Sequence, residues 1–481
     1  MTMRVRFGGM VLGLVILLAP AGAGAAEKPV LTLKELLPMA WKYSPEVKAT
    51  KSEVTLAKEQ KNEVHGYRWP QLDTTATGGV TGKARLPRVR GVGEDSTLFI
   101  PDPKDKLHGV AIFGHLDFSV IQPLYTFGKI AYREEAAARN IKVKEAGVDS
   151  KKGEVMLQVS EAYYGLILAE QGKGAVKDAR TYLDDTRERI TRLLAINSPN
   201  VKESDRYRLA AYEGALEKFA AQADEGSKVA YKALKALTGY PEDQDFQVPQ
   251  DLPNPTAAPQ PLDYYVREAL EMRPEFTQLK EGLVARQLLV DAARADRYPS
   301  FFFAVVGQLA GAGPGRKYNP DPYINDFFND RGALPMLGAK WHFDFGILKA
   351  KIGQAQAELD QLKYTEKTAL MGIPIEVARS YGQVQENYKG SVGMEKAYIN
   401  ARRWLVTSFS NFDMGLGKLD DIFLAFERYG AFRGDYLQAL YDYNLSVAKL
   451  DKSTGAYRRA LPPEAPPGAP VKPEAGKAPV K

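Results

Sequence analysis

Hydrophobic residues recur every three or four positions through two long stretches of the chain. The first stretch has apolar residues at intervals of four, three, four and three, at Val155, Val159, Ala162, Leu166 and Ala169. The second has a similar series at Ile373, Val377, Tyr381, Val384 and Tyr388. This spacing is typical of helices that pack along one side, as in coiled coils.

Proline positions help to set the length of these helices. No proline occurs between Pro123 and Pro199, so a helix is predicted over about residues 129–195. It would be roughly 100 Å long at 1.5 Å per residue. A helix of this length needs partners beside it, in the same chain or in other subunits. Pro374 lies inside the second helical stretch and is expected to kink it.

Between the helical stretches the hydrophobic period changes to two, which predicts β-strands. One alternating set of apolar residues is Leu337, Ala339, Trp341, Phe343 and Phe345. Another is Leu116, Phe118 and Val120, after which the alternation changes parity at Ile121, where a bulge would account for the change. Two further strands are expected near residues 71–80 and 300–309. Segments rich in Gly, Pro and Asp, about 83–108 and 312–333, are expected to be exposed loops that join the strands in pairs.

The chain contains two copies of one helix–strand–strand–helix plan. Ser44-Pro45-Glu46 recurs 229 residues later as Arg273-Pro274-Glu275, and Phe127-Gly128 recurs 218 residues later as Phe345-Gly346. Asp205 and Gly239 have counterparts 216 residues later in Asp421 and Gly455. Offsets that are constant within blocks and shift between them indicate a duplication with loops of different length. We therefore expect a first repeat over residues 27–239, a linker over 240–262 and a second repeat over 263–457.

The two ends of the chain differ in composition from the repeats. Arg4 and Arg6 precede an apolar run and a series of small residues up to Ala26, which predicts a cleaved signal peptide over residues 1–26. Residues 458–481 are rich in proline, alanine and lysine and are expected to be a disordered tail. The sequence has no cysteine, so it offers no disulfide, no thiolate metal ligand and no lipidated cysteine.

Charge and motifs narrow the range of functions. The net charge of +6 is small and dispersed, which does not favour nucleic acid as a partner. The four histidines lack metal-ligand spacing, and we find neither a nucleophile elbow nor a phosphate-binding loop. We expect no catalysis, no metal and no cofactor. After Ala26 no apolar stretch is long enough for a transmembrane helix, so insertion into a membrane would require a closed β-barrel. Four strands are too few to close one, which implies an oligomer.

These features together resemble the TolC-type family of outer-membrane efflux proteins, over about residues 30–457. The residues that carry the resemblance begin each repeat and flank its strands: Ser44-Pro45-Glu46, Arg273-Pro274-Glu275, Trp69-Pro70, Tyr298-Pro299, the segments Gln122 to Gly128 and Phe343 to Gly346, and Gly415-Leu416-Gly417 before Asp421. The resemblance implies an α+β membrane protein. Its long helices would form a coiled-coil barrel in the periplasm of a Gram-negative cell, and three chains would share a twelve-stranded β-barrel in the outer membrane.

The function implied by the resemblance is export. The chain would be one subunit of a homotrimeric channel in a tripartite efflux or type I secretion system, acting as a passive conduit. Its expected partners are a periplasmic adaptor (membrane fusion) protein, an inner-membrane pump of the RND, ABC or a similar class, and outer-membrane lipid. A passive tunnel leaves the choice of substrate to the pump, so drugs, metals, organic solvents and secreted polypeptides all remain open.

The resemblance also implies candidate site residues. In the family the periplasmic tip is closed at rest by polar links and an acidic ring, and the matching gate candidates are Asp205 and Asp421, with Asp420 next to the latter. Leu424 stands where the family prototype has a second acid. The two matching aspartates fit a capping role equally well, because each lies at the start of a helix, where the helix dipole favours an acid. Candidates for lining the barrel lumen are His115, Asp117, Lys340, His342 and Asp344, although the simpler interpretation is that these side chains are merely solvated.

A second interpretation is an exported structural coiled-coil protein of the periplasm, or an adhesin. It accounts for the signal peptide and the helices but not for the paired period-two segments with aromatic faces. Solubility without detergent would distinguish it from a channel. A periplasmic adaptor is disfavoured, because an adaptor has one hairpin beside a β-sandwich and this chain has two complete copies of its plan.

Overall fold

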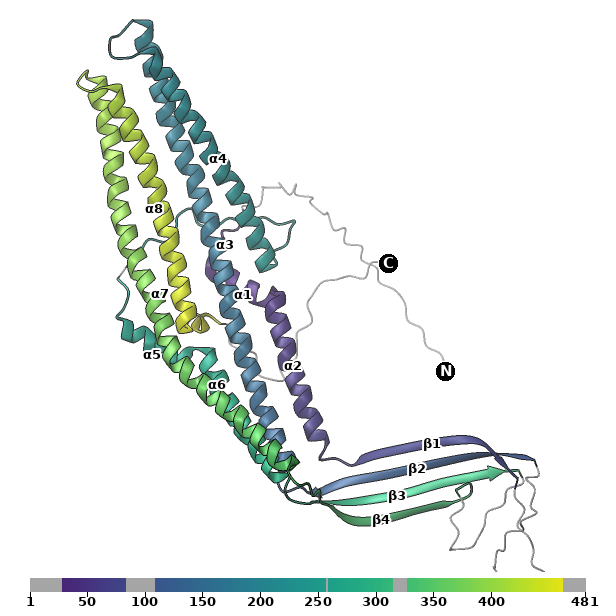
Figure 1. The fold of residues 1–481 in the computed structure, drawn as a ribbon. Coiled ribbons are helices and arrows are strands. Elements are labelled where there is room, and N and C mark those ends of the chain that lie inside the picture. The colour runs from purple at the N-terminus through teal and green to yellow at the C-terminus, as the bar shows by residue number, and fades with distance from the viewer. Residues whose placement is uncertain (1–27, 84–108, 257, 315–326, 462–481) are drawn as a thin grey trace, which may run out of the picture.

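The computed structural model describes residues 28–83, 109–256, 258–314 and 327–461. The expected signal peptide, most of the two loops between paired strands and nearly all of the expected tail lie outside these residues. Figure 1 shows a long bundle of helices with a β-sheet that projects from one end at an angle. Within the described ranges, no helix combines the length and the apolar character needed to cross a membrane.

The lengths of the elements show the duplication. The first repeat consists of α1 (Leu33–Tyr43), α2 (Pro45–Gly66), β1 (Gln71–Gly82), β2 (Val110–Tyr125), α3 (Lys129–Ala195) and α4 (Glu203–Thr238). The second consists of α5 (Leu262–Met272), α6 (Pro274–Ala295), β3 (Ser300–Gly313), β4 (Arg331–Lys340), α7 (Ile347–Asp413) and α8 (Leu419–Thr454), followed by a short 3-10 helix, η1 (Ala456–Ala460). Corresponding helices have equal lengths of 11, 22, 67 and 36 residues. The predicted internal repeat is confirmed, and α3 has the predicted bounds.

Short sequence signals set several helix ends. Ser44 precedes α2, and its hydroxyl oxygen accepts a hydrogen bond from the Val47 N–H at 3.4 Å. Pro45 takes the first helical position, where a backbone donor is not needed. Gly239 and Gly455 end α4 and α8 with φ angles of 65° and 77°, in the left-handed region that glycine adopts without strain.

The helices form a bundle whose composition changes along its length. Close to the sheet, α2, α3, α6 and α7 are neighbours, whereas further away the neighbours are α4, α3, α8 and α7. Predicted core positions Val155 and Val159 are buried in a cluster with Trp41 of α1. Ile373 and Val377 pack near α5, and Pro374 between them is accommodated inside a continuous α7. Figure 1 shows α7 changing direction where α5 lies against it, as expected for a proline kink.

The sheet is antiparallel throughout, with strand order β1-β2-β3-β4. Its register sorts the side chains onto two faces, because successive residues of a strand point to opposite sides. The face that we call the apolar face includes Leu72, Val80, Ile112, Leu116, Phe118, Val120, Val305, Leu309, Leu337 and Ala339. The opposite face, the polar face, includes Asp73, Thr75, His115, Asp117, Ser119, Gln308 and Lys340. Both predicted alternating sets, up to Ala339, therefore lie on one side of the sheet.

The strand predictions need correction at their ends. β4 stops at Lys340, which pairs with Ser300, so the predicted alternation through Phe345 is wrong beyond that residue. The residue just before β3 is Pro299. Because proline has no backbone N–H, the hydrogen bonds between β3 and β4 cannot continue past Ser300 and Lys340. The irregularity expected at Ile121 lies instead between Pro123 and Tyr125. The second loop is shorter than predicted, because β3 continues to residue 313 and β4 begins at residue 331.

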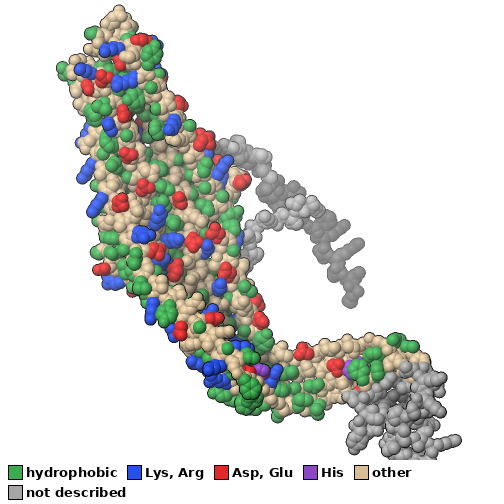
Figure 2. Space-filling model, in the orientation of Figure 1, with side chains coloured by type: hydrophobic (Ala, Val, Ile, Leu, Met, Phe, Trp, Pro, Cys, Tyr) green, Lys and Arg blue, Asp and Glu red, His purple; other side chains and the backbone are tan. Residues whose placement is uncertain are grey.

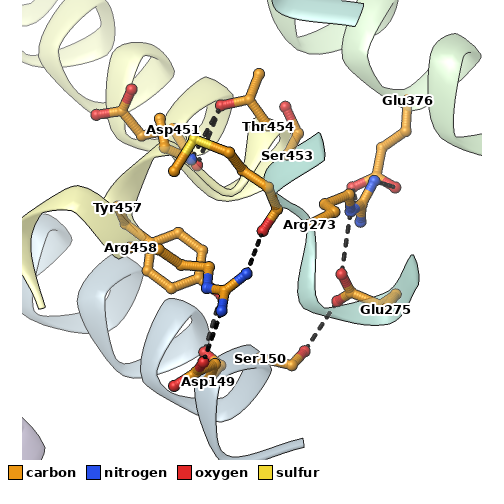
Figure 3. A network of polar contacts seen from close by, with 12 residues as sticks. Asp149, Ser150, Arg273, Glu275, Glu376, Asp451, Ser453, Thr454, Tyr457 and Arg458 are labelled. Atoms are coloured by element: carbon orange, nitrogen blue, oxygen red, sulfur yellow. Dashed lines mark hydrogen bonds and ion pairs between the residues drawn. The ribbon is translucent and has the colours of Figure 1, made fainter. Parts of the chain in front are cut away.

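A polar network in the middle of the bundle joins the end of the second repeat to the first (Figure 3). The Tyr457 hydroxyl donates to the Asp149 backbone oxygen at 2.8 Å. The Arg458 guanidinium donates to the Asp149 carboxylate at 3.2 Å and to the Met272 carbonyl at 2.9 Å. The ring of Tyr457 covers Gly153 so closely that an added Cβ would lie 2.6 Å from it.

These contacts also correct the predicted tail and place the linker. The tail was expected to begin at residue 458, but Arg458 and the two residues after it belong to η1, because its guanidinium is bound on two sides. The linker lies against the bundle. Phe246 and Leu252 are buried in the same apolar cluster as Val155 and Val159, and the Asn444 side chain of α8 donates to the Pro253 carbonyl at 2.9 Å.

Candidate functional site

The two helical hairpins end at the side of the molecule away from the sheet (Figure 1). Residues 196–202 connect α3 to α4, and residues 414–418 connect α7 to α8. An apolar cluster between the hairpins contains Ile190, Leu405, Phe412 and Phe423, all buried. Separating the hairpins would expose this apolar surface, so the cluster holds the two hairpins together.

The two gate candidates Asp205 and Asp421 occupy equivalent positions in the repeats. Each is the third residue of its helix, and its carboxylate accepts the backbone N–H of the residue before the helix. The donors are Lys202, at 2.8 Å from Asp205, and Lys418, at 3.0 Å from Asp421. Each aspartate therefore stabilises the start of its own helix, and within the described part of the chain neither carboxylate bonds to the other hairpin. The capping interpretation is confirmed, and the gate interpretation stays a prediction.

Contacts between the hairpins come from other residues. Arg189 of α3 binds both carboxylate oxygens of Asp413 at the end of α7, with distances of 2.9 and 3.0 Å. Its guanidinium also lies 4.9 Å from the Phe409 ring centroid. Arg208 of α4 forms an ion pair with Asp420 of α8. Of the three gate candidates, Asp420 is the one that joins the two hairpins.

Further links extend this pattern along the hairpins. The Tyr212 hydroxyl of α4 donates to Glu427 of α8 at 3.3 Å, and Arg433 of α8 donates to Asp178 of α3 at 2.6 Å. The sequence prediction missed these residues. One signal was present: Asp413 is the last residue of α7, where the helix dipole disfavours an acid, so a cation from elsewhere was to be expected beside it.

The five lumen candidates divide into two groups. His115, Asp117 and Lys340 lie on the polar face of the sheet, as predicted. His342 and Asp344 follow β4 and are not part of a described strand. The Asp344 carboxylate accepts the N–H groups of Leu348 at 2.8 Å and Gly346 at 3.0 Å, and these bonds lower its pKa. Its role is to start α7.

His115 is not a solvated side chain, contrary to the simpler interpretation. It is 5% exposed, whereas the side chain of Asp117 beside it is 53% exposed. The burial comes from Phe327, which lies over the imidazole ring with ring centroids 4.4 Å apart. No local pattern at residue 115 could have indicated a cover from a segment 212 residues away.

Comparison with known proteins identifies the fold. No family model and no curated protein matches the chain. The solved structure of the CmeC outer membrane channel of Campylobacter jejuni matches with a TM-score of 0.66 and 16% identity over 90% of both chains. The open state of the MtrE outer membrane channel of Neisseria gonorrhoeae matches with a TM-score of 0.67 and 17% identity, over 88% of both chains. The solved structure of CusC matches with a TM-score of 0.69 and 15% identity, over 88% of this chain and 92% of the CusC chain. The chain has the fold of these outer-membrane channels, as the resemblance implied.

Proposed function

We propose that this chain is one subunit of a homotrimeric outer-membrane channel that exports substrates from a Gram-negative cell. In this proposal the sheets of three chains form one barrel in the outer membrane, and the helices form a tunnel through the periplasm. The channel is a passive conduit in an efflux or type I secretion system, with a periplasmic adaptor and an inner-membrane pump as partners. Nucleic acid is not among the expected partners.

The observation that carries the proposal is the apolar face of the sheet. Its side chains point away from the polar face into open space, and Leu72 and Leu337 are 63% and 77% exposed. Among the residues of the described strands, Arg331 at the end away from the helices is the only charged side chain on this face. An exposed apolar surface of this size fits a lipid environment and does not fit a water-soluble protein.

The edges of the sheet support an oligomer. Among the strands that the structure describes, β1 and β4 are the outer ones, and each has one strand neighbour in the sheet. Unpaired backbone groups cannot face lipid, so an edge in a membrane needs a neighbour. Placing β4 of one chain against β1 of the next closes three four-stranded sheets into twelve strands, with the polar face inside.

The alternative of a periplasmic structural protein or an adhesin is weaker on the same observation. It needs the sheet to be stable in water, where the apolar face would promote aggregation. The long hairpins are compatible with either proposal and do not distinguish them.

Planar bilayers provide the direct test. The mature protein, extracted in detergent, should give stepwise currents when it is added to a bilayer. Leu337→Arg should prevent insertion, because arginine on a lipid-facing strand costs up to about 2–4 kcal/mol. Leu334→Arg is the matched control: Leu334 is a similarly exposed leucine of the same strand, but it lies on the polar face. A protein that is soluble without detergent, or equal insertion of both variants, would refute the proposal.

A further inference from the structure

Two aromatic residues ahead of β4 fold over the polar face of the sheet. Phe327 stacks on the His115 ring, with centroids 4.4 Å apart and 12° between the planes. Phe328 makes an edge contact with Phe113, with centroids 4.9 Å apart. Phe113 and His115 both lie on the polar face. We call Phe327–Phe328 the aromatic flap.

The flap is attached to the sheet through the two residues that follow it. The Asn329 side-chain oxygen accepts the Ala312 N–H of β3 at 2.9 Å. The Asp330 carbonyl accepts the Ala310 N–H at 2.6 Å. These bonds fix one end of the flap at the end of the sheet away from the helices. Figure 2 shows histidine, acidic and hydrophobic side chains gathered near that end.

His115 holds Phe327 of the flap through one hydrogen bond, and a second bond to Asp117 holds the imidazole ring in place. Its Nδ1 lies 2.8 Å from the Phe327 backbone oxygen, and its Nε2 lies 3.0 Å from Asp117 Oδ1. A carbonyl oxygen and an ionised carboxylate can only accept, so both ring nitrogens must carry hydrogen. The arrangement therefore requires the imidazolium form. A neutral ring would set a lone pair against one of the two acceptors, and the buried ring has little access to water that could replace the lost contact.

The surroundings of the ring agree with a positive charge. Among the described residues, the charged groups that act on it are Asp117 on its own strand and Asp330 beside β3, and both are acids. Its paired residues on the neighbouring strands, Thr77 of β1 and Ala310 of β3, carry no charge. The flap itself contributes a backbone carbonyl and aromatic rings.

We propose that the aromatic flap is a pH-dependent constriction at the outer mouth of the channel. His115 holds it across the lumen while the imidazole is protonated, and releases it when the proton is lost. The inference rests on the proposed function, because the polar face is the lumen wall only in a barrel. The channel should therefore conduct less in acidic medium than in alkaline medium.

Three substitutions test this proposal in planar bilayers between about pH 5.5 and about pH 8.5, on either side of the ordinary histidine titration. Wild-type conductance should rise with pH, since loss of one charge-assisted bond shifts the held-to-released ratio by about tenfold. In His115→Gln, the glutamine cannot donate to both the Phe327 carbonyl and Asp117 as the two ring nitrogens do. The flap should then be released, and the channel should conduct well at every pH. Asp117→Asn should do the opposite and stay restricted at high pH, because its amide can donate to Nε2 while a neutral ring still donates from Nδ1.

Asp73→Asn is the matched control for Asp117→Asn. It removes the same charge from the same polar face, at a position paired with Ser119 and without a contact to His115. It should keep the wild-type pH response. The proposal is overturned if wild-type conductance is independent of pH. It is also overturned if His115→Gln and Asp117→Asn both raise the conductance, or both lower it, relative to wild type.

A second measurement does not depend on conduction. Ring ¹⁵N chemical shifts of the four histidines in detergent-solubilised protein, assigned with His→Gln variants, report how many hydrogens each ring carries. His115 should be doubly protonated at about pH 7.5 in wild type and singly protonated, on Nδ1, in Asp117→Asn. A singly protonated wild-type ring overturns the latch even if channels form. A doubly protonated ring in a protein that forms no channels overturns the proposed function, and with it the constriction, but leaves the attachment of the flap to His115 intact.

Discussion

Removing the carboxylate of Asp413 should make the helical tip easier to open. Asp413→Asn keeps the size of the side chain but loses the charge that Arg189 binds through two nitrogens, at 2.9 and 3.0 Å. The hydrogen bonds from Arg189 lower the pKa of Asp413, so the carboxylate is ionised at neutral pH. This pair joins α3 to α7, and it exists only while the hairpins lie together.

The size of the effect follows from the exposure of the pair. The Arg189 side chain is 25% exposed and the Asp413 side chain 51%, so solvent screens their attraction. We therefore use the value of a well-placed surface pair, about 0.5–1 kcal/mol. Since about 1.4 kcal/mol is tenfold, the closed-to-open ratio should fall about two- to fivefold. Asp420→Asn breaks a more exposed pair with Arg208 and should change the ratio by about twofold at most. The two pairs share no residue, so the double variant should show the product of both effects.

Single-channel open probability measures this ratio directly. The control is Asp421→Asn, whose carboxylate binds the Lys418 N–H of its own helix and should leave the open probability unchanged. High salt should reduce the difference in open probability between wild type and Asp413→Asn, because salt screens the Arg189–Asp413 attraction that only the wild type has. An Asp413→Asn channel with wild-type open probability, or an Asp421→Asn channel that opens as readily, would refute the assignment of closure to the links between hairpins.

Three further predictions concern stability and can be measured by thermal unfolding in detergent. Burial raises the pKa of Asp451 to about 6, so its contribution is fully present below about pH 4 and is lost as the pH rises through 6. The protein should gain on the order of 2 kcal/mol between about pH 7.5 and about pH 4.5, and a variant Asp451→Asn with the same gain would contradict this origin. Gly153→Ala should destabilise the protein by about 2 kcal/mol, because the added Cβ would meet the Tyr457 ring. Gly174→Ala is the control: it lies in the same helix with open space around it and should stabilise the protein by about 0.5–1 kcal/mol. Equal effects of the two substitutions would rule out the clash. Tyr457→Phe should cost about 1 kcal/mol for the lost bond to Asp149, and an unchanged melting temperature would show that this bond contributes nothing.

The helices and the faces of the sheet could be predicted because their signals are local and repeated. The proline-free stretch with a coiled-coil period gave α3 its bounds, and the duplication placed α7 and α8 by analogy. The alternation at Leu116–Val120 and Leu337–Ala339 assigned the apolar face correctly. The end of β4 at Lys340 was missed, because it depends on the partner strand, which begins just after Pro299.

Side-chain pairs between distant segments were beyond the sequence. Arg189 and Asp413 are separated by 224 residues, and each is one of many charged residues on a long helix surface. Asp205 and Asp421 were selected because they match the gate positions of the family that the chain resembles, but their equivalent places in the two repeats give both the same local role as caps. The cover over His115 depends on how the β3–β4 connection folds back, which no periodicity encodes.

The contact between η1 and α3 has a consequence for the order of folding. A chain is synthesised from its N-terminus, yet Arg458 binds a residue 309 positions earlier. The first repeat is therefore complete in sequence long before Gly153 receives its cover from Tyr457, and until then its surface stays open to chaperones and proteases. A chain interrupted anywhere in the second repeat lacks η1 and therefore never closes this site.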